Sequence, residues 1–162
     1  MMKFEKVAMA FYGPANSGKT TLITKIADNF IKNNFRVGIL KYDFHDEASF
    51  DIKRKDSFKF YQTGADVIVS SHRRTTFFSH SSIDVDDCMK LGNYDVFLVE
   101  GLRSMNIPRI AVFHREINRN YLKICHAIAS KQQIFEQNIK WLNLDNIDEI
   151  CEHVLKYGKR IN

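Results

Sequence analysis

A glycine-rich stretch near the N-terminus has the residue types and the spacing that bind phosphate. It reads GPANSGKTT over residues 13–21 and matches the pattern G-x-x-x-x-G-K-[ST]. Gly13 and Gly18 allow backbone angles and close approaches that a Cβ would obstruct, so the loop can turn its N–H groups inward around an anion. Lys19 can reach the β- and γ-phosphates as a point charge, and Thr20 can offer its hydroxyl to Mg²⁺. The pattern therefore predicts a site for a nucleoside triphosphate.

The segments on either side of this stretch suit a phosphate-binding loop. Residues 7–12 are mostly apolar, which is typical of a buried strand. From Lys19 onward, apolar residues recur at helical spacing, and Asn33 and Asn34 are expected to end this helix. The apolar stripe consists of Leu22, Ile23, Ile26, Ala27, Phe30 and Ile31. Because the positive end of the helix dipole would face the phosphates, we interpret the loop as functional.

A second acidic element is needed in P-loop proteins, at the end of another buried strand and next to the Mg²⁺. Glu100 follows the apolar run YDVFLV, and an ionised carboxylate in that position is costly without a cation nearby. Its neighbour Gly101 could bring a backbone N–H close to the γ-phosphate. Asp43, at the end of LKYD, is the second candidate. The alternatives are a strand-end carboxylate that faces solvent and a plain turn aspartate.

Two further groups of polar residues carry weaker indications. Arg73 and Arg74 follow a predicted strand and could neutralise phosphate charge as an arginine finger does, although a solvated basic loop explains them too. His45 is followed by two acidic residues, but no second histidine stands at ligand spacing, which argues against a metal site.

Length and composition indicate a globular chain, and we predict one nucleotide-binding domain over residues 1–162. No apolar run reaches the roughly 18 residues that span a bilayer, and the N-terminus does not read as a signal peptide, so we expect a cytoplasmic protein without membrane contact. The 24 Lys and Arg against 19 Asp and Glu give a net charge of +5. The basic residues are scattered, with the densest cluster at residues 53–59, so a nucleic-acid partner is not expected.

Cysteine usage points to no special chemistry. The three cysteines are far apart and odd in number, and no pair has metal-ligand spacing. Buried or half-buried thiols are therefore predicted at Cys88, Cys125 and Cys151.

Strand and helix patterns alternate along the chain, which predicts an α/β fold of the P-loop NTPase type, with three α/β/α layers and a mainly parallel sheet. A short helix is expected to stop at Gly64, another to be capped by Ser82 and to end near Gly92, and a final helix to be capped by Asp145 or Asn146. Beyond the first strand, further strands are expected at residues 35–42, 66–71, 75–79, 94–99, 109–114 and 124–130.

One short segment bears on the identity of the base. No N-K-x-D sequence, the guanine-reading motif of many GTPases, occurs in the chain. Residues 129–131, Ala-Ser-Lys after a predicted strand, resemble the short loop that borders a guanine in P-loop GTPases.

Four separated segments together resemble the MobB family, the molybdopterin-guanine dinucleotide biosynthesis adaptor proteins. They read FYGPANSGKTTLITKI, RVGILKYDFH, FDIKRKDSFKFYQTGADVIVSSHRRT and VFLVEGLRSMNIPRIAVF. The last two segments are more specific than the phosphate loop, which is generic. The chain also departs from the family pattern: Tyr42 replaces the usual histidine after Lys41, Lys131 stands where an acidic residue is common, and a Pro-Gly pair is missing between Ile52 and Lys55.

The resemblance implies a GTP-binding protein with weak, Mg²⁺-dependent GTPase activity that acts in molybdenum cofactor biosynthesis. It also implies a homodimer and a functional partner, the MobA-type molybdenum cofactor guanylyltransferase. Thr20 and Glu100 carry over as Mg²⁺ contacts, and Lys19 and Glu100 are the predicted catalytic residues. By position, the implied phosphate-binding residues are Gly13, Ala15, Asn16, Ser17, Gly18, Lys19, Thr20 and Thr21.

Two other functions remain open from the residues alone. A P-loop small-molecule kinase would use the same loop, but it usually needs a lid with arginines, and no arginine-rich insertion is visible. A nucleic-acid-binding regulator would exploit the positive charge, but the chain lacks a recognised reading motif.

Overall fold

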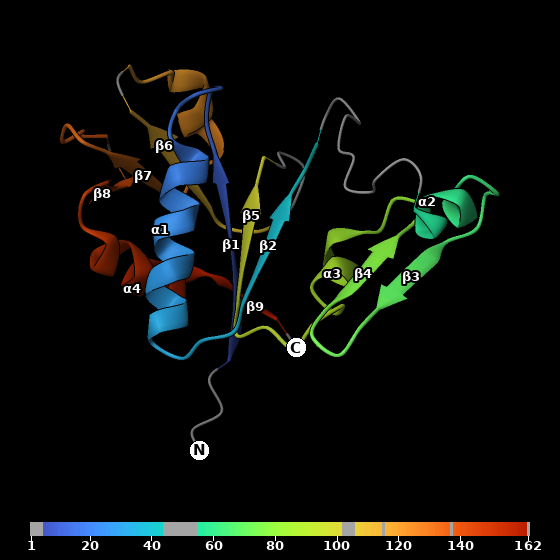
Figure 1. The fold of residues 1–162 in the computed structure, drawn as a ribbon. Helices are drawn as coiled ribbons and strands as arrows, with labels where there is room; N and C mark the ends of the chain where they lie inside the picture. Colours follow the sequence, from blue (N-terminus) through green and yellow to red (C-terminus); the bar gives the residue numbers. More distant parts are fainter. Residues whose placement is uncertain (1–4, 44–54, 102–105, 115, 137, 162) are drawn as a thin grey trace. The chain divides into compact units, whose positions relative to one another are not determined.

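The apolar run before the phosphate loop forms strand β1 (Lys6–Tyr12), inside a seven-stranded sheet of the computed structural model (Figure 1). The structure describes residues 5–43, 55–101, 106–114, 116–136 and 138–161. The chain divides into two compact units, one made of residues up to 42 and from 89 onward, the other of residues 43–88. That residues 1–162 form one domain stays a prediction.

The sheet belongs to the first unit and is mostly parallel. Strand β9 (Lys159–Ile161) pairs antiparallel with β1, and the other neighbouring strands pair in parallel. Their spatial order is β2 (Val37–Lys41), β5 (Val96–Glu100), β1, β6 (Arg109–Phe113), β7 (Ala127–Ser130) and β8 (Lys140–Asn143). This arrangement confirms the predicted α/β class with a mainly parallel sheet.

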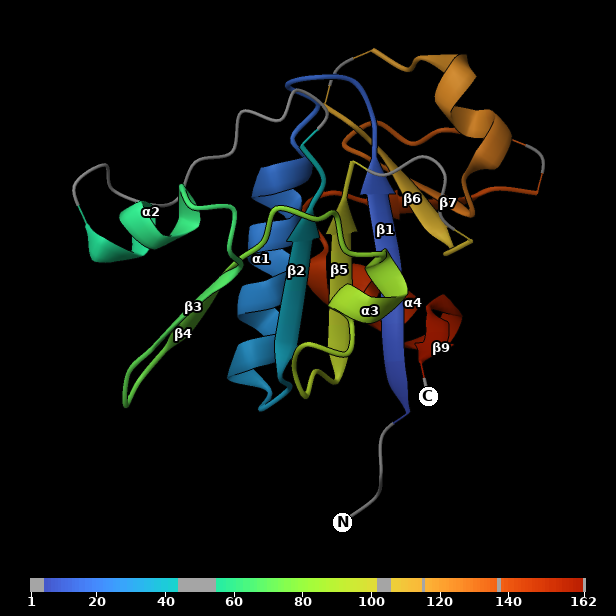
Figure 2. The same ribbon diagram turned by 90° about the vertical axis from the view of Figure 1, so that its right-hand side faces the viewer.

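Helices lie on both faces of this sheet. Helices α1 (Lys19–Lys32) and α4 (Ile147–Tyr157) contact each other and cover one face, as the two views in Figures 1 and 2 agree. Successive side chains of β1 point to opposite faces, so Phe11 packs toward these helices and Tyr12 packs on the other face. There Tyr12 contacts Tyr121 of the 3-10 helix η1 (Arg119–Ile124), with ring centroids 5.4 Å apart.

Helix α1 follows the predicted boundaries and most of the predicted apolar stripe. Asn33 is its C-cap, and Asn34 adopts a φ of 65°, a left-handed conformation that asparagine tolerates and that ends the helix. The stripe residues up to Phe30 are buried. Ile31 is 59% exposed, so its assignment to the stripe was wrong: it follows the last buried position and has turned toward solvent.

Helix α4 resolves the choice between two caps. The side chain of Asn146 accepts a hydrogen bond from the backbone N–H of Glu149, at 3.3 Å, while Asp145 lies in the preceding turn.

Strands β8 and β9 and helix η1 were not predicted. Strand β8 is a four-residue segment with polar residues at both ends, and β9 has three residues, so neither carries an extended apolar pattern.

A histidine pair, of which His153 is buried and His126 is exposed, lies between α4 and the start of β7. His153 of α4 is 5% exposed, and its Nε2 lies 3.3 Å from Nδ1 of His126. Burial lowers the pKa of His153 to about 4, and the charges of His126, Lys140 and Lys156 act in the same direction, against the opposing effect of Glu149.

This pair should make the protein less stable in mild acid. Because the pKa of His153 is lower in the folded state than in the unfolded chain, the unfolded chain binds more protons between pH 6.5 and pH 4, and stability falls as the pH falls through that window. The expected loss between pH 7 and pH 5 is about 2 kcal/mol of unfolding free energy, measured by urea denaturation. His153→Gln should lose most of this pH dependence, whereas His114→Gln, at an exposed position, should keep it. An unchanged pH dependence in His153→Gln would contradict the assignment.

The second unit contains a short antiparallel ribbon rather than further parallel strands. Strands β3 (Val67–Ser70) and β4 (Thr75–Phe78) pair antiparallel with each other and form a separate two-stranded sheet. Helix α2 (Asp56–Tyr61) precedes them, and the chain then turns at Gly64, which has a φ of 91°. The predicted stop at Gly64 therefore corresponds to this turn.

The predicted helix over residues 82–92 is much shorter in the structure. Helix α3 spans Val85–Cys88, and Asp84 precedes it and accepts a hydrogen bond from the N–H of Asp86 at 2.8 Å. The expectation that Ser82 caps the helix was wrong, because the aspartate two residues later makes the local side-chain-to-backbone bond that competes for this role.

The cysteine prediction is confirmed. Cys88 and Cys125 are partly buried and Cys151 is buried, all as free thiols. Burial raises the pKa of Cys151 to about 12 and that of Cys125 to about 11, which keeps both thiols protonated and unreactive at neutral pH.

Of the helices in the described part of the chain, none combines the length and the apolar character that a membrane span requires.

Candidate nucleotide-binding site

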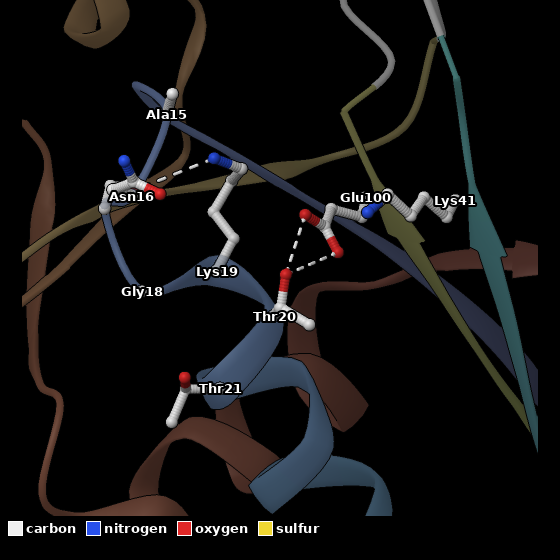
Figure 3. A pocket seen from close by; sticks show the side chains of 9 residues that line it. Ala15, Asn16, Gly18, Lys19, Thr20, Thr21, Lys41 and Glu100 are labelled. Carbon is white, nitrogen blue, oxygen red and sulfur yellow. Dashed lines mark hydrogen bonds between the residues drawn. The ribbon is translucent and has the colours of Figure 1, made fainter. Parts of the chain in front are cut away.

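The carboxyl ends of three neighbouring strands bring the predicted site together. Strand β5 lies between β2 and β1, and all three run parallel, so their last residues meet at one edge of the sheet. There Glu100 is opposite Phe11 on one side and Lys41 on the other. A pocket of about 460 Å³ opens at this edge, lined by residues 15–21, Lys41 and Glu100 (Figure 3).

The backbone of the loop has the conformation that an anion nest requires. Gly18 is the N-cap of α1 with a φ of 89°, and Asn16 has a φ of 59°. Because Gly18 has no side chain that could cap the helix, the first amides of α1 receive no side-chain cap and can bind an anion instead. Ser17 is 6% exposed, and its hydroxyl oxygen lies 2.9 Å from the position that a Cβ on Gly13 would occupy.

Gly13 is required because of both space and its φ of 157°, whereas Gly18 is required because of its backbone angle alone. A Cβ at Gly13 would lie 2.5 Å from the carbonyl oxygen of Val112, which is fixed in strand β6. At Gly18 no atom of the described chain lies within 4 Å of such a Cβ, but the positive φ strains any L side chain.

Gly13→Ala should therefore be more damaging than Gly18→Ala. We expect Gly13→Ala to lower the free energy of unfolding by about 3 kcal/mol, because the backbone of β6 or of the loop must shift. Gly18→Ala should cost about 1 kcal/mol, from conformational strain alone. Urea denaturation of the nucleotide-free protein measures both values, and the reverse order would contradict this account of the loop.

The Lys19 side chain lies over the loop. Its Nζ donates hydrogen bonds to the carbonyl oxygens of Pro14 at 2.7 Å and Gly13 at 3.1 Å. Partial burial lowers the pKa of Lys19, and the Lys41 ammonium acts in the same direction, while the Glu100 carboxylate acts to raise it. A cation at the loop and next to a helix N-terminus makes this end of the pocket favourable for a phosphate group.

The predicted metal ligands lie together although 80 residues separate them in the chain. The Thr20 hydroxyl donates to the Glu100 carboxylate, with its oxygen 3.1 Å from Oε1 and 3.2 Å from Oε2 (Figure 3). A hydroxyl and a carboxylate are hard oxygen ligands of the kind that Mg²⁺ prefers, and two protein ligands leave positions for phosphate oxygens and water. Among the described residues, no cluster of three or more His, Cys, Asp or Glu could form an all-protein metal cage. This donor set therefore fits Mg²⁺ bound together with a phosphate ligand.

The sequence suggested several other residues for this site. The Gly101 N–H donates a hydrogen bond to the carbonyl oxygen of Phe11 at 3.2 Å, as part of the pairing between β5 and β1. Because this N–H group already has a partner, the expectation that it points to the γ-phosphate was wrong. The roles of Asp43, Arg73 and Arg74, which belong to the second unit, stay predictions. His45 lies outside the described residues.

The proposed guanine-bordering loop after β7 is held by hydrogen bonds of its own. The Ser130 hydroxyl donates to the carbonyl oxygen of Gln132 at 2.7 Å and accepts from the indole N–H of Trp141 at 3.0 Å. These bonds fix the backbone of residues 130–132 at the end of the sheet. Any contact of this loop with a base stays a prediction.

One pocket residue was not predicted as a site residue. Lys41 was noted as part of a strand, but its place beside Glu100 depends on the strand order, which the sequence does not state. Seven of the eight predicted phosphate binders, residues 15–21, line the pocket. The eighth, Gly13, accepts a hydrogen bond from the Lys19 ammonium through its carbonyl oxygen. That these residues bind a nucleotide stays a prediction.

Comparison with known proteins identifies the family. The family model described as molybdopterin guanine dinucleotide synthesis protein B, or MobB, matches residues 8–131. The chain belongs to the MobB family. This confirms the resemblance that the four sequence segments indicated, and the matched range includes the phosphate loop and every pocket residue of this MobB-family chain.

Individual MobB relatives match over nearly their whole length. A molybdopterin-guanine dinucleotide biosynthesis adapter protein of Escherichia coli (strain K12) is 24% identical over 166 residues, covering 95% of this chain and 94% of the relative. The protein of the same description from Haemophilus influenzae is 27% identical over 151 residues, covering 88% and 84%. The crystal structure of a molybdopterin-guanine biosynthesis protein B is 26% identical, with a TM-score of 0.72, covering 93% of this chain and 97% of that one.

Proposed function

We propose that this chain binds GTP with Mg²⁺ in the pocket formed by residues 15–21, Lys41 and Glu100, and hydrolyses it slowly as an adapter in molybdopterin-guanine dinucleotide biosynthesis. The observation that carries the proposal is the hydrogen-bonded pair of Thr20 and Glu100 beside Lys19. A hydroxyl, a carboxylate and an ammonium at the mouth of an anion nest are the groups that a magnesium triphosphate needs.

Different residues of the pocket would bind the phosphates and the metal ion. The backbone of the loop and the N-terminus of α1 would hold the phosphates, and the Lys19 ammonium would leave its carbonyl partners to contact the β- and γ-phosphates. Thr20 and Glu100 would hold Mg²⁺, which when bound offsets the negative charge that develops on the phosphate oxygens.

Slow turnover is consistent with the described residues of the pocket lining. Among the described residues that line the pocket, Glu100 is the only carboxylate, and its role as a metal ligand leaves it unsuited to activate water. With no separate general base in this lining, the attacking water would be poorly positioned.

The preference for guanine rests on the relatives. The similar proteins from Escherichia coli and Haemophilus influenzae are named as adapters of molybdopterin-guanine dinucleotide biosynthesis. A guanine nucleotide as ligand is consistent with a place in that process, and the residues of the pocket support phosphate and metal binding.

The decisive experiment is a calorimetric titration of the chain with GTP, ATP and GDP, each with Mg²⁺ and with EDTA. We expect GTP to bind more tightly than ATP and to depend on Mg²⁺. Release of phosphate to water should then be followed over hours, in parallel with candidate small-molecule acceptors. Transfer of the phosphate to an acceptor instead of water would favour the alternative, a P-loop small-molecule kinase.

The proposed partners are a molybdenum cofactor guanylyltransferase of the MobA type and a second copy of the chain. The description of the relatives as adapters supports association with a biosynthetic enzyme. Exposed apolar side chains of the β3–β4 ribbon, Ile68, Val69 and Phe77, are consistent with burial on self-association. Sedimentation equilibrium tests the dimer, and co-sedimentation with a purified guanylyltransferase tests the partner; a monomer in the first or separate migration in the second would contradict each proposal.

A further inference from the structure

Lys41 presents a second ammonium group to the nucleotide pocket. It is the last residue of β2 and pairs in register with Glu100 of β5, so both side chains leave the sheet at the same edge. Lys41 is exposed and lines the same pocket as the phosphate loop. In the described part of the chain, its ammonium makes no hydrogen bond or ion pair, in contrast with the Lys19 ammonium, which contacts two loop carbonyls.

The strand order places Lys41 at the far end of the pocket from the loop. The loop leaves the end of β1, the next strand is β5 with Glu100, and the strand after it is β2 with Lys41. Figure 3 shows the same order, with the loop on one side, the facing pair of Thr20 and Glu100 in the middle, and Lys41 beyond Glu100. A phosphate chain held in the loop and reaching the metal ligands therefore extends toward Lys41 with its terminal group.

The charges in the pocket support the same placement. Two lysines against one glutamate leave an excess of one positive charge, and without Lys41 the charged side chains would cancel. The positive charge of Lys41 contributes to the lowered pKa of Lys19, so the two ammonium groups repel each other across the pocket. An anionic group between them relieves this repulsion, and a terminal phosphate supplies one.

We propose that Lys41 binds the terminal phosphate of the triphosphate and thereby makes the site prefer a nucleoside triphosphate over a diphosphate. The inference rests on the proposed function in that it assumes a nucleotide in this pocket. A diphosphate held by the loop ends before it reaches Lys41, so it gains nothing from the second ammonium group. Lys41 is thus a specificity-determining residue for the state of the nucleotide.

The test is the ratio of triphosphate to diphosphate affinity in matched variants. A non-hydrolysable GTP analogue and GDP are each titrated, with Mg²⁺, into the wild-type chain, Lys41→Gln, Lys41→Arg and Lys32→Gln. Lys32 is an exposed α1 lysine paired with Asp28, so its variant controls for the loss of one positive charge. Lys41→Gln should weaken binding of the analogue about tenfold and that of GDP less than about twofold, because one charge-assisted hydrogen bond is lost. Lys41→Arg should keep most of the wild-type ratio, and Lys32→Gln all of it.

Three outcomes would overturn the role of Lys41. Equal losses for the analogue and GDP would show general electrostatic attraction, unchanged binding would show no contact, and tighter binding of the analogue would show that Lys41 repels the metal. The wild-type titration judges the proposed function separately. If ATP binds more tightly than GTP, the proposed preference for guanine is wrong. The ratio of triphosphate to diphosphate affinity, measured with an ATP analogue and ADP, then still tests the role of Lys41. If no nucleotide binds, both proposals fail.

Discussion

Lys19→Ala should reduce the affinity for GTP at least about 100-fold in isothermal titration calorimetry. The Lys19 ammonium is the cation nearest the anion nest, where its Nζ lies 2.7 Å from the Pro14 carbonyl oxygen. Once it is removed, the phosphates face the Glu100 carboxylate with one compensating charge fewer. Neither the N–H groups of the loop nor the helix dipole can replace a full positive charge at hydrogen-bond distance.

The stability of this variant must be measured beside its affinity. Lys19→Ala also removes the bonds to the Gly13 and Pro14 carbonyls, which are solvent-accessible in part, so we expect a change of about 1 kcal/mol or less in unfolding free energy. Lys32→Ala, on the exposed side of the same helix, is the matched control and should bind GTP as the wild type does. A folded Lys19→Ala protein with nearly unchanged affinity would remove the assignment of the loop as the nucleotide site.

Glu100→Ala should weaken GTP binding about 10- to 100-fold in the presence of Mg²⁺ and not at all in EDTA. With the metal, the variant lacks the one carboxylate among the described residues of the pocket lining, and the Thr20 hydroxyl loses its partner. Without the metal, the Glu100 carboxylate repels the phosphates, so removing it should leave binding unchanged or strengthen it. Only the affinity measured with Mg²⁺ is thus expected to fall, whereas a general loss of folding would weaken binding in both conditions.

The controls for this prediction separate charge from metal ligation. Glu100→Gln preserves the size of the side chain and removes its charge, and should behave like Glu100→Ala because Mg²⁺ strongly prefers a carboxylate. Glu152→Ala, at an exposed position of α4, should leave both affinities unchanged. Equal weakening with Mg²⁺ and with EDTA would count against Glu100 as a metal ligand and would place it in the structure of the pocket only.

Much of this site could be predicted from sequence because its main part is local. The phosphate loop needs a strand, nine consecutive residues and a helix, and each of these is recorded in neighbouring residues. Glycine at positions 13 and 18 reflects the close approach to Val112 and the positive φ of the helix cap, respectively. Glu100 could also be proposed, since a carboxylate directly after a buried strand is costly unless a cation compensates it.

Other features depended on which strands pair with each other. Strands β3 and β4 were both predicted from the sequence, but that they pair antiparallel with each other and form a separate sheet was not. Strands β8 and β9 are short and form because an existing sheet edge supplies their hydrogen-bond partners. The His126–His153 pair likewise joins residues 27 positions apart, through the packing of α4 on the sheet.

The sequence by itself determined the loop of residues 13–21 and the acid that ends a buried strand, because each is specified by residue types within a short stretch, and four separated segments together indicated the family. The tertiary structure alone decided that β5 lies between β1 and β2. That order places Glu100 next to Thr20 and Lys41 next to Glu100. The strand order could not be predicted from the local propensity of any segment. The physical reason is that strand order results from the burial of whole sheet faces under α1 and α4, a property of the packed chain rather than of any segment.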